Sequence, residues 1–140
     1  MIRMPRNRKI DEIRSVDLFS SCTDAELHAV ARLCDTVDLV AGAVLTRAGR
    51  RTRAFLVIVD GETFEGHGPG DHVGEHELLT DTPADETVVT ATTLRVLAFE
   101  SRTFATLLQR VPVVAVKLLR EYADAFEAAD EAETLERAVA

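Results

Sequence analysis

The spacing of apolar residues changes twice along the chain, which predicts a helix, a β-rich middle and further helices. Thr23 and Glu26 form a capping box ahead of apolar residues three and four apart, which predicts one short helix. From Thr36 to Phe99, β-branched residues come in short runs between glycines, a pattern typical of a small antiparallel barrel or sandwich. Helical spacing returns after Phe99, where Ser101 is the expected cap.

The last helix is predicted to run from about residue 112 to 137. Pro112 suits a first helical turn, and the residues after it are rich in Ala, Leu, Glu and Arg with no helix breaker. Its apolar positions lie three and four apart before acidic residues interrupt them: Leu119, Tyr122, Phe126 and Ala129. This pattern predicts a helix that packs over part of its length, or that meets a partner there.

Length and composition predict one globular domain. We expect a basic N-terminal arm over residues 1–16 and a single domain over residues 17–140. No apolar run approaches the roughly 18 residues that span a bilayer, and the opening residues lack the apolar stretch of a signal peptide, so we expect a cytoplasmic protein without membrane insertion. Cys22 and Cys34 are predicted to be reduced core thiols without a redox or metal role.

Charge is distributed unevenly along the chain. The net charge of -8 argues against direct nucleic-acid binding, which depends on clustered basic residues. The opening segment is nevertheless basic, through Arg3, Arg6, Arg8, Lys9 and Arg14. The C-terminal segment is acidic, through Glu121, Asp124, Glu127, Asp130, Glu131, Glu133 and Glu136. The two ends could attract each other within one chain or between two, although a frayed terminus and a solvated helix face explain the same pattern.

The order of these elements resembles the cyclic-nucleotide-binding domain, the module shared by catabolite-activator regulators, regulatory subunits of protein kinase A and cyclic-nucleotide-gated channels. The stretch "FLVIVDGE" is similar to its central strand, and "GPGDHVGEHELL" to its P-G-x-x-x-G-E-x-x-L approach to the phosphate-binding cassette. The resemblance covers about residues 18–126. It implies a mainly β fold with flanking helices, namely a β-roll of the jelly-roll type with an N-terminal helix and a long C-terminal helix. The hairpin between Gly61 and Pro69 is shorter than the family usually shows.

The resemblance also assigns ligand-binding positions. In the family, the glutamate of the G-E pair accepts a hydrogen bond from the ribose, while backbone amides and an arginine hold the phosphate. Gly74 and Glu75 match the G-E pair, and Leu78 and Leu79 match the apolar residues that pin the cassette. The family arginine maps to Ala84, and Glu86 replaces a small residue. The remaining cassette positions are His76, Asp85, Thr87 and Val88.

These departures predict weak nucleotide binding. Losing a charge-assisted pair costs about 1.5–3 kcal/mol. A carboxylate about 4 Å from the phosphate adds up to roughly 4 kcal/mol of repulsion at an effective dielectric constant near 20. Even half of that sum weakens binding by on the order of a hundredfold.

Three interpretations follow. The leading one is a regulatory module that has lost ordinary cyclic-nucleotide binding and acts by protein contact, with another protein or with itself, through Leu119, Tyr122 and Phe126. The second is a genuine cyclic-nucleotide sensor with a non-standard cation, for which Arg95 is the main candidate beside Arg47 and Arg53. The third is a structural subunit or scaffold of a larger assembly.

One competing motif overlaps the cassette. His72, Glu75 and His76 spell H-x-x-E-H, which on a helix can bind zinc, with the glutamate as general base. Gly74 inside the motif argues against that helix. No serine has a matching His and Asp pattern. We therefore predict no catalytic residue, no metal and no cofactor.

Overall fold

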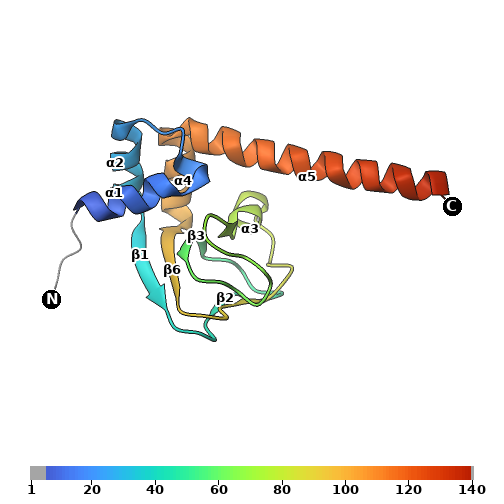
Figure 1. Ribbon diagram of the computed structural model, residues 1–140, viewed down its shortest axis with the longest axis horizontal. Coiled ribbons are helices and arrows are strands. Elements are labelled where there is room, and N and C mark those ends of the chain that lie inside the picture. Colours follow the sequence, from blue (N-terminus) through green and yellow to red (C-terminus); the bar gives the residue numbers. More distant parts are fainter. Residues whose placement is uncertain (1–5, 140) are drawn as a thin grey trace.

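The computed structural model describes residues 6–139, which form a small β-roll flanked by helices (Figure 1). Three short helical elements come first: α1 (Arg6–Ser15), the 3-10 helix η1 (Asp17–Phe19) and α2 (Asp24–Leu33). Six strands follow: β1 (Asp35–Leu39), β2 (Val44–Thr46), β3 (Ala54–Asp60), β4 (His72–Val73), β5 (Val88–Val89) and β6 (Leu94–Glu100). Helix α3 (Glu75–Thr80) lies between β4 and β5, and α4 (Ser101–Arg110) and α5 (Pro112–Val139) end the chain. The predicted mainly β fold with flanking helices is confirmed.

Two helix starts test the expected caps. The capping box at α2 is confirmed, because the Thr23 hydroxyl accepts from the Glu26 amide and the Glu26 carboxylate accepts from the Thr23 amide. The expected cap at Ser101 is wrong, because α4 already includes Ser101 and its N-cap is Glu100. Strand β6 runs directly into this helix, and the Ser101 amide donates to the carbonyl oxygen of Arg53 (3.2 Å).

The strands form two antiparallel sheets. The larger one has the order β1-β6-β3-β4, with β3 and β6 paired from Ala54 opposite Glu100 onward. The smaller sheet pairs β2 with β5. An isolated bridge between Thr63 and Thr90 extends the smaller sheet's side of the roll.

The main core lies between the larger sheet and the helices. Phe19, Phe55 and Phe99 are fully buried there, with ring centroids 6.2 Å apart for Phe19 and Phe99 and 5.7 Å for Phe55 and Phe99. The inside of the roll has a much smaller buried cluster, made of Ile58, Leu94 and Val96. The scaffold is therefore held mainly on its helical side.

The two ends of the chain differ in how they pack. Part of the predicted basic arm is the helix α1, whose Ile13 is fully buried and whose Lys9 Nζ donates to the carbonyl oxygens of Ala31 (2.7 Å) and Cys34 (2.8 Å). At the other end, α5 is buried only as far as Leu118, and residues 119–138 are exposed. Figure 1 shows this half of α5 extending beyond the rest of the molecule. Among residues 6–139, no helix is long and apolar enough to cross a membrane.

The two cysteines are free thiols on the helical side. Cys34 is buried and Cys22 is half-buried. Burial raises the pKa of the Cys34 thiol to about 11 and also raises the pKa of Cys22. Both thiols are therefore protonated and unreactive near neutral pH.

Candidate ligand-binding site

Gly74 fixes the start of the cassette. It is the N-cap of α3 and has a left-handed φ of 100°. A Cβ at this position would overlap the carbonyl oxygen of Ala54 in β3, so the close approach of the two segments requires glycine. The same turn separates His72 in β4 from His76 in α3, so the H-x-x-E-H stretch is not one helix. Within residues 6–139, no cluster of three or more metal-ligating side chains is present.

Glu75 is held by contacts within the protein. One carboxylate oxygen, Oε2, lies 3.0 Å from Nδ1 of His72, and the other, Oε1, accepts a hydrogen bond from the Tyr122 hydroxyl of α5 at 3.3 Å. The contact with His72 is an ion pair whose angles do not meet those of a hydrogen bond. Burial alone would raise the pKa of Glu75, but His72 outweighs it and holds that pKa below its ordinary value. Glu75 is therefore a carboxylate whose two oxygens both have partners.

His72 connects the cassette to the C-terminal helix. Its Nε2 donates to Oε2 of Glu121 at 2.7 Å, on the opposite side of the ring from Glu75. Burial opposes the charged form of His72, yet the two carboxylates outweigh it and raise the pKa to about 9. His72 is therefore a cation at neutral pH. The contacts of Glu75, His72, Glu121 and Tyr122 together form what we call the α5 latch.

The other cassette positions are only partly brought together. Ala84 is buried (4% exposed), and its backbone pairs with Gly49 and Arg50 instead of facing a ligand. Val88 is buried in β5, and the Thr87 hydroxyl accepts from the Ala48 amide at 3.0 Å. Asp85 and Glu86 are exposed, as is His76, whose ring lies 6.2 Å from that of Tyr122. Leu78 packs against the main core.

A cavity of about 150 Å³ remains at the cassette. We call it the cassette hollow; it is lined by Thr46, His67, His72, Val73, Gly74, Glu75, His76, Glu77, Glu86 and Val88. Three of these side chains are carboxylates, and among residues 6–139 no lysine or arginine lines the cavity. His67 approaches Glu86 at 3.7 Å. The lining therefore sets three carboxylates against the single charged imidazole of His72, and this excess of negative charge disfavours an anion.

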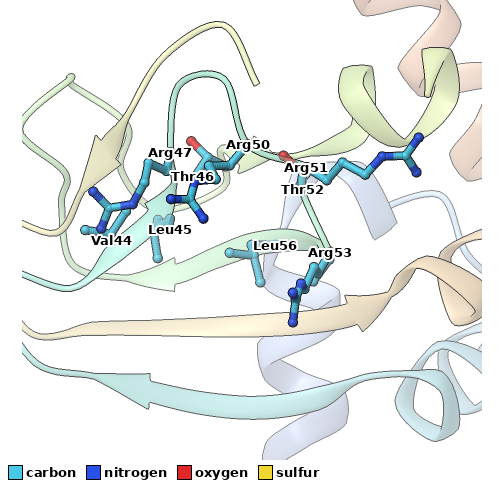
Figure 2. A pocket seen from close by; sticks show the side chains of 10 residues that line it. Val44, Leu45, Thr46, Arg47, Arg50, Arg51, Thr52, Arg53 and Leu56 are labelled. Carbon is cyan, nitrogen blue, oxygen red and sulfur yellow. The ribbon is translucent and has the colours of Figure 1, made fainter. Parts of the chain in front are cut away.

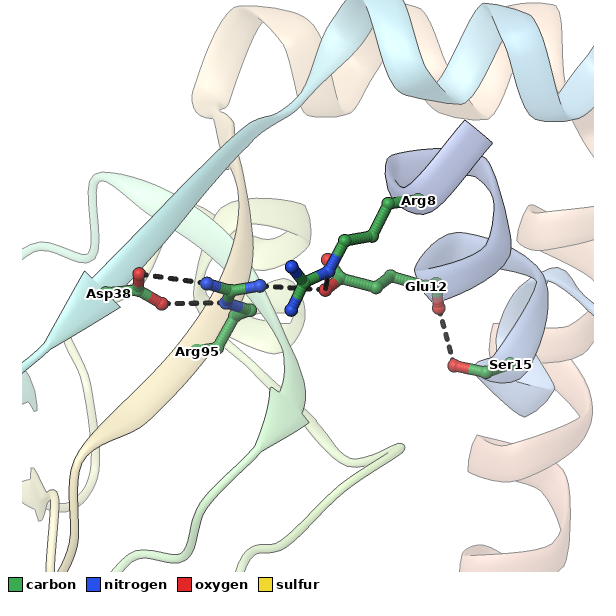
Figure 3. A network of polar contacts seen from close by, with 5 residues as sticks. All are labelled: Arg8, Glu12, Ser15, Asp38 and Arg95. Carbon is green, nitrogen blue, oxygen red and sulfur yellow. Dashed lines mark hydrogen bonds and ion pairs between the residues drawn. The ribbon is translucent and has the colours of Figure 1, made fainter. Parts of the chain in front are cut away.

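Arg95 is engaged elsewhere (Figure 3). Its Nε and Nη2 donate to the two carboxylate oxygens of Asp38 at 2.8 and 3.1 Å, and its Nη1 donates to Glu12 of α1 at 2.8 Å. These hydrogen bonds raise the pKa of Arg95 and lower that of Asp38. Arg95 thus ties α1 to the sheet, and it is not among the residues that line the cassette hollow.

A second, larger cavity of about 430 Å³ lies beside β2 (Figure 2). We call it the arginine hollow; it is lined by Val44, Leu45, Thr46, Arg47, Arg50, Arg51, Thr52, Arg53, Ala54 and Leu56. Of these residues, Thr46 alone also lines the cassette hollow. The positive charge of this face of the roll therefore lies outside the cassette.

The predicted partner residues are exposed on α5. Leu119 is 67% exposed and Phe126 78% exposed, whereas Tyr122 is partly covered by its contact with Glu75. Lys117 lies just before the exposed half of α5. Its Nζ donates to the carbonyl oxygen of Asp17 and to Ser20 Oγ, so these hydrogen bonds hold the helix to η1 at the point where it becomes exposed.

Sequence reasoning did not find the latch or the clamp. His72 attracted attention only as a candidate metal ligand, and Glu121 is one acid among several on its helix. The contact between them joins residues that are 49 positions apart. No local pattern signals such a pair.

Comparison with known proteins identifies the fold. The family described as "Cyclic nucleotide-binding domain" matches residues 36–111. A cyclic nucleotide-gated potassium channel of Mesorhizobium japonicum is 29% identical over 109 residues, covering 74% of this chain and 31% of the channel. The catabolite activator protein of Thermus thermophilus superimposes with a TM-score of 0.74 at 21% identity, covering 84% of this chain and 62% of that one.

Regulatory subunits of protein kinase A are also similar in structure. The regulatory domain from Toxoplasma gondii, solved with cAMP, has a TM-score of 0.71 at 22% identity and covers 85% of this chain and 49% of that one. A subunit of a cAMP-independent kinase from Trypanosoma brucei, solved as a triple mutant bound to cAMP, has a TM-score of 0.70 at 22% identity, with 83% and 46% coverage.

The chain thus spans less than a third of the channel and between about half and three fifths of these solved chains. At these identities the solved structures establish the fold. The family match covers more than half of the 140 residues. This protein therefore belongs to the cyclic nucleotide-binding domain family.

Proposed function

We propose that this chain is a regulatory, non-catalytic module that does not take up ordinary cyclic AMP or cyclic GMP and acts through protein contact. The observation that carries the proposal is the engagement of Glu75 by His72 and Tyr122. A nucleotide ribose would have to displace these contacts to reach the carboxylate.

The size and charge of the cassette hollow support the same conclusion. Its volume of about 150 Å³ is below the roughly 300–1,000 Å³ typical of small-molecule sites. Glu75, Glu77 and Glu86 contribute negative charge to its lining. Ala84, at the position of the family arginine, supplies no cation. The loss of a charge-assisted pair, about 1.5–3 kcal/mol, adds to the repulsion from these carboxylates.

One similar structure supports a role for this fold without cyclic AMP. The Trypanosoma brucei regulatory subunit belongs to a kinase described as cAMP-independent. Its cAMP-bound form carries three substitutions, one of which introduces an arginine. We infer by analogy that the present chain keeps the regulatory scaffold, while its cassette lacks the arginine that the family uses to hold a cyclic phosphate.

The exposed half of α5 is the proposed contact surface. Leu119, Phe126 and Leu135 are large apolar side chains exposed to solvent on the half of α5 whose contacts with the other described elements are confined to the latch. The latch fixes the base of this half-helix to the cassette, so covering the helix and rearranging the cassette are physically coupled. A protein partner, either a second copy or another chain, would remove this apolar surface from water.

Calorimetric titration of the purified chain with cyclic AMP and cyclic GMP tests the proposal. We expect no binding below about 1 mM, which corresponds to about -4 kcal/mol. Binding of either nucleotide at micromolar affinity would overturn the proposal in favour of a sensor with a non-standard cation. Sedimentation at several concentrations tests self-association through α5. A monomer at all concentrations would exclude the second copy and leave a different protein as the partner.

A further inference from the structure

We propose that the arginine hollow is a binding site for a small organic phosphate that carries two or more negative charges. The site lies on the loop between β2 and β3, outside the cassette, and serves a function separate from that proposed above. The inference rests on unpaired positive charge, on an apolar floor and on the size of the cavity.

The loop concentrates positive charge in an acidic protein. Residues 47–53 contain four arginines and no acidic residue, although the chain has a net charge of -8. Arg51 forms an ion pair with Asp81 at 3.1 Å. Within residues 6–139, the guanidinium groups of Arg47, Arg50 and Arg53 have no carboxylate within the 4.0 Å limit for an ion pair. Three neighbouring cations without counter-charges repel one another, and a bound anion would relieve that repulsion.

The four arginines do not point the same way. Figure 2 shows Arg51 extended toward α3, while Arg47, Arg50 and Arg53 lie on the side of the loop that faces Leu45 and Leu56. The neighbouring cavity on the α3 side is lined by Glu77, Asp81 and Glu100, whereas no carboxylate lines the arginine hollow. Arg51 and Arg53 line both cavities, but Arg51 is the one whose guanidinium pairs with a carboxylate, that of Asp81. Arg47, Arg50 and Arg53 therefore supply the positive charge of the anion site.

The floor of the hollow is apolar. Leu45 and Leu56 are half-buried and pack against the small core inside the roll, and Val44 is 42% exposed at the edge. An arginine rim above an apolar floor fits a ligand with a phosphate end and a flat or apolar end. The guanidinium group presents planar paired donors that match phosphate oxygens.

The size of the cavity favours a small ligand over a protein segment. Its volume of about 430 Å³ falls in the usual range of about 300–1,000 Å³ for small-molecule sites. The acidic half of α5 from a second copy has suitable charge, but a helix with side chains is about 10–12 Å across and needs a longer groove. Cyclic AMP carries one negative charge, which would leave most of the positive charge of the three arginines without a counter-charge.

Titrations with pyrophosphate and ATP test this site, by calorimetry at low salt. Pyrophosphate probes the charge alone, and ATP adds a flat base for the apolar floor. We expect both to bind, ATP more tightly, and cyclic AMP to bind at least about tenfold more weakly than either, because about 1.4 kcal/mol separates each decade. Each of Arg47→Ala, Arg50→Ala and Arg53→Ala should weaken ATP binding by about tenfold.

Arg51→Ala is the matched control. Arg51 also lines the hollow, but its guanidinium extends toward α3 and pairs with Asp81, so the change removes the same charge from the same loop and leaves the three guanidinium groups without carboxylate partners in place. We expect it to change ATP affinity by less than about threefold. Two results would overturn the inference: no binding of either probe at about 1 mM, or an equal loss of affinity in Arg51→Ala. Tight binding of a peptide of residues 120–139 with no binding of ATP would reassign the surface to a protein partner. Circular dichroism of each variant shows that the fold is retained.

Discussion

The cassette hollow and the arginine hollow lie on either side of Thr46 and have opposite electrostatics. The cassette hollow is small and acidic, and its polar groups are paired with one another through His72, Glu75 and Glu121. The arginine hollow is larger, and Arg47, Arg50 and Arg53 lack acidic partners among the described residues. One roll thus presents an acidic hollow at the cassette beside a basic one on the loop between β2 and β3.

This difference shows that the backbone geometry of a binding site and the side-chain charges that would hold a ligand can vary independently. Gly74 caps α3 and approaches β3 so closely that a side chain there would overlap the Ala54 carbonyl oxygen, so the backbone here is constrained by packing as well as by any ligand. The charges that would hold a phosphate depend on single side chains and can be absent without disturbing that backbone. Family membership therefore supports the fold, and ligand binding has to be argued from the site.

The largest effect is expected from Gly74→Ala, which tests whether the cassette backbone is structural. The new Cβ would overlap the Ala54 carbonyl oxygen at a positive φ, so we expect a loss of about 2–4 kcal/mol in the free energy of unfolding. Gly70→Ala is the control, because Gly70 has φ of 91° with open space around it, and should lose only about 1 kcal/mol. Chemical denaturation measures both. Equal losses would show that the contact with β3 is unimportant.

The next variant makes the cassette hollow less acidic and more basic, as the arginine hollow is. Ala84→Arg combined with Glu86→Ala supplies a cation and removes an acid, so we expect cyclic AMP affinity to rise by about a hundredfold or more. Because Ala84 is buried, Asp85→Arg with Glu86→Ala is a second variant that places the guanidinium at an exposed neighbour. Calorimetry measures the gain. If both variants fold and neither binds, the missing cation does not explain the weak site.

Arg95→Met separates a structural arginine from a ligand-binding one. The change removes the hydrogen bond to Glu12, whose side chain is 15% exposed, and leaves it only the longer ion pair with Arg8 at 3.7 Å, so we expect a loss of about 1–2 kcal/mol in unfolding free energy. Arg102→Met, at an exposed position of α4, should change stability by less than about 0.5 kcal/mol. Neither variant should alter the response to cyclic AMP. Nucleotide binding by the unmodified chain that disappears in Arg95→Met would contradict this assignment.

Glu121→Gln weakens the α5 latch without altering the hollow itself. Glu121 is half exposed, so we expect a loss of only about 0.5–1 kcal/mol, with faster hydrogen exchange in α5 near Tyr122. Glu127→Gln, further along the exposed half of the helix, is the control and should leave exchange unchanged. Similar exchange in the two variants would mean that the latch does not hold the helix.

The smallest expected effect is the pH dependence of that difference. The folded-state pKa of His72, about 9, lies above its ordinary value near 6.5. Its stabilising contribution is therefore complete below about pH 6.5 and is lost as the pH rises through 9. The pKa of Glu75 is lowered, so its contribution is present above its ordinary value and is lost in acid. The stability gap between the parent chain and Glu121→Gln should shrink between pH 7 and 10; a constant gap would contradict the charged state of His72.

The fold was predictable because its signals are local. The capping box at Thr23, the glycine-punctuated strands and the unbroken helix after Pro112 each report on a few neighbouring residues, and the structure confirms all three. The expected cap at Ser101 was wrong because β6 runs directly into α4. The Ser101 amide there donates to the carbonyl oxygen of Arg53, so no side-chain cap is needed for it.

The site was less predictable because its contacts are long-range. The assignment of Glu75 located the cassette, but its partners come from β4 and from α5. Arg47 and Arg53 were considered only as helpers of the cassette, because a sequence cannot show that the loop faces a separate hollow. Arg95 alternates along β6 like any strand residue, and its partners Glu12 and Asp38 lie far away in sequence.

An NMR titration that follows the chemical shift of each backbone amide monitors ligand binding at both hollows in one experiment. With the unmodified chain, we predict that cyclic AMP at about 1 mM leaves the amides of Gly74, Glu75 and Glu86 unshifted. Pyrophosphate in the same sample should shift the amides of residues 47–53. Shifts at Gly74 and Glu75 that saturate at micromolar cyclic AMP would contradict the claim that this cassette no longer holds a cyclic phosphate.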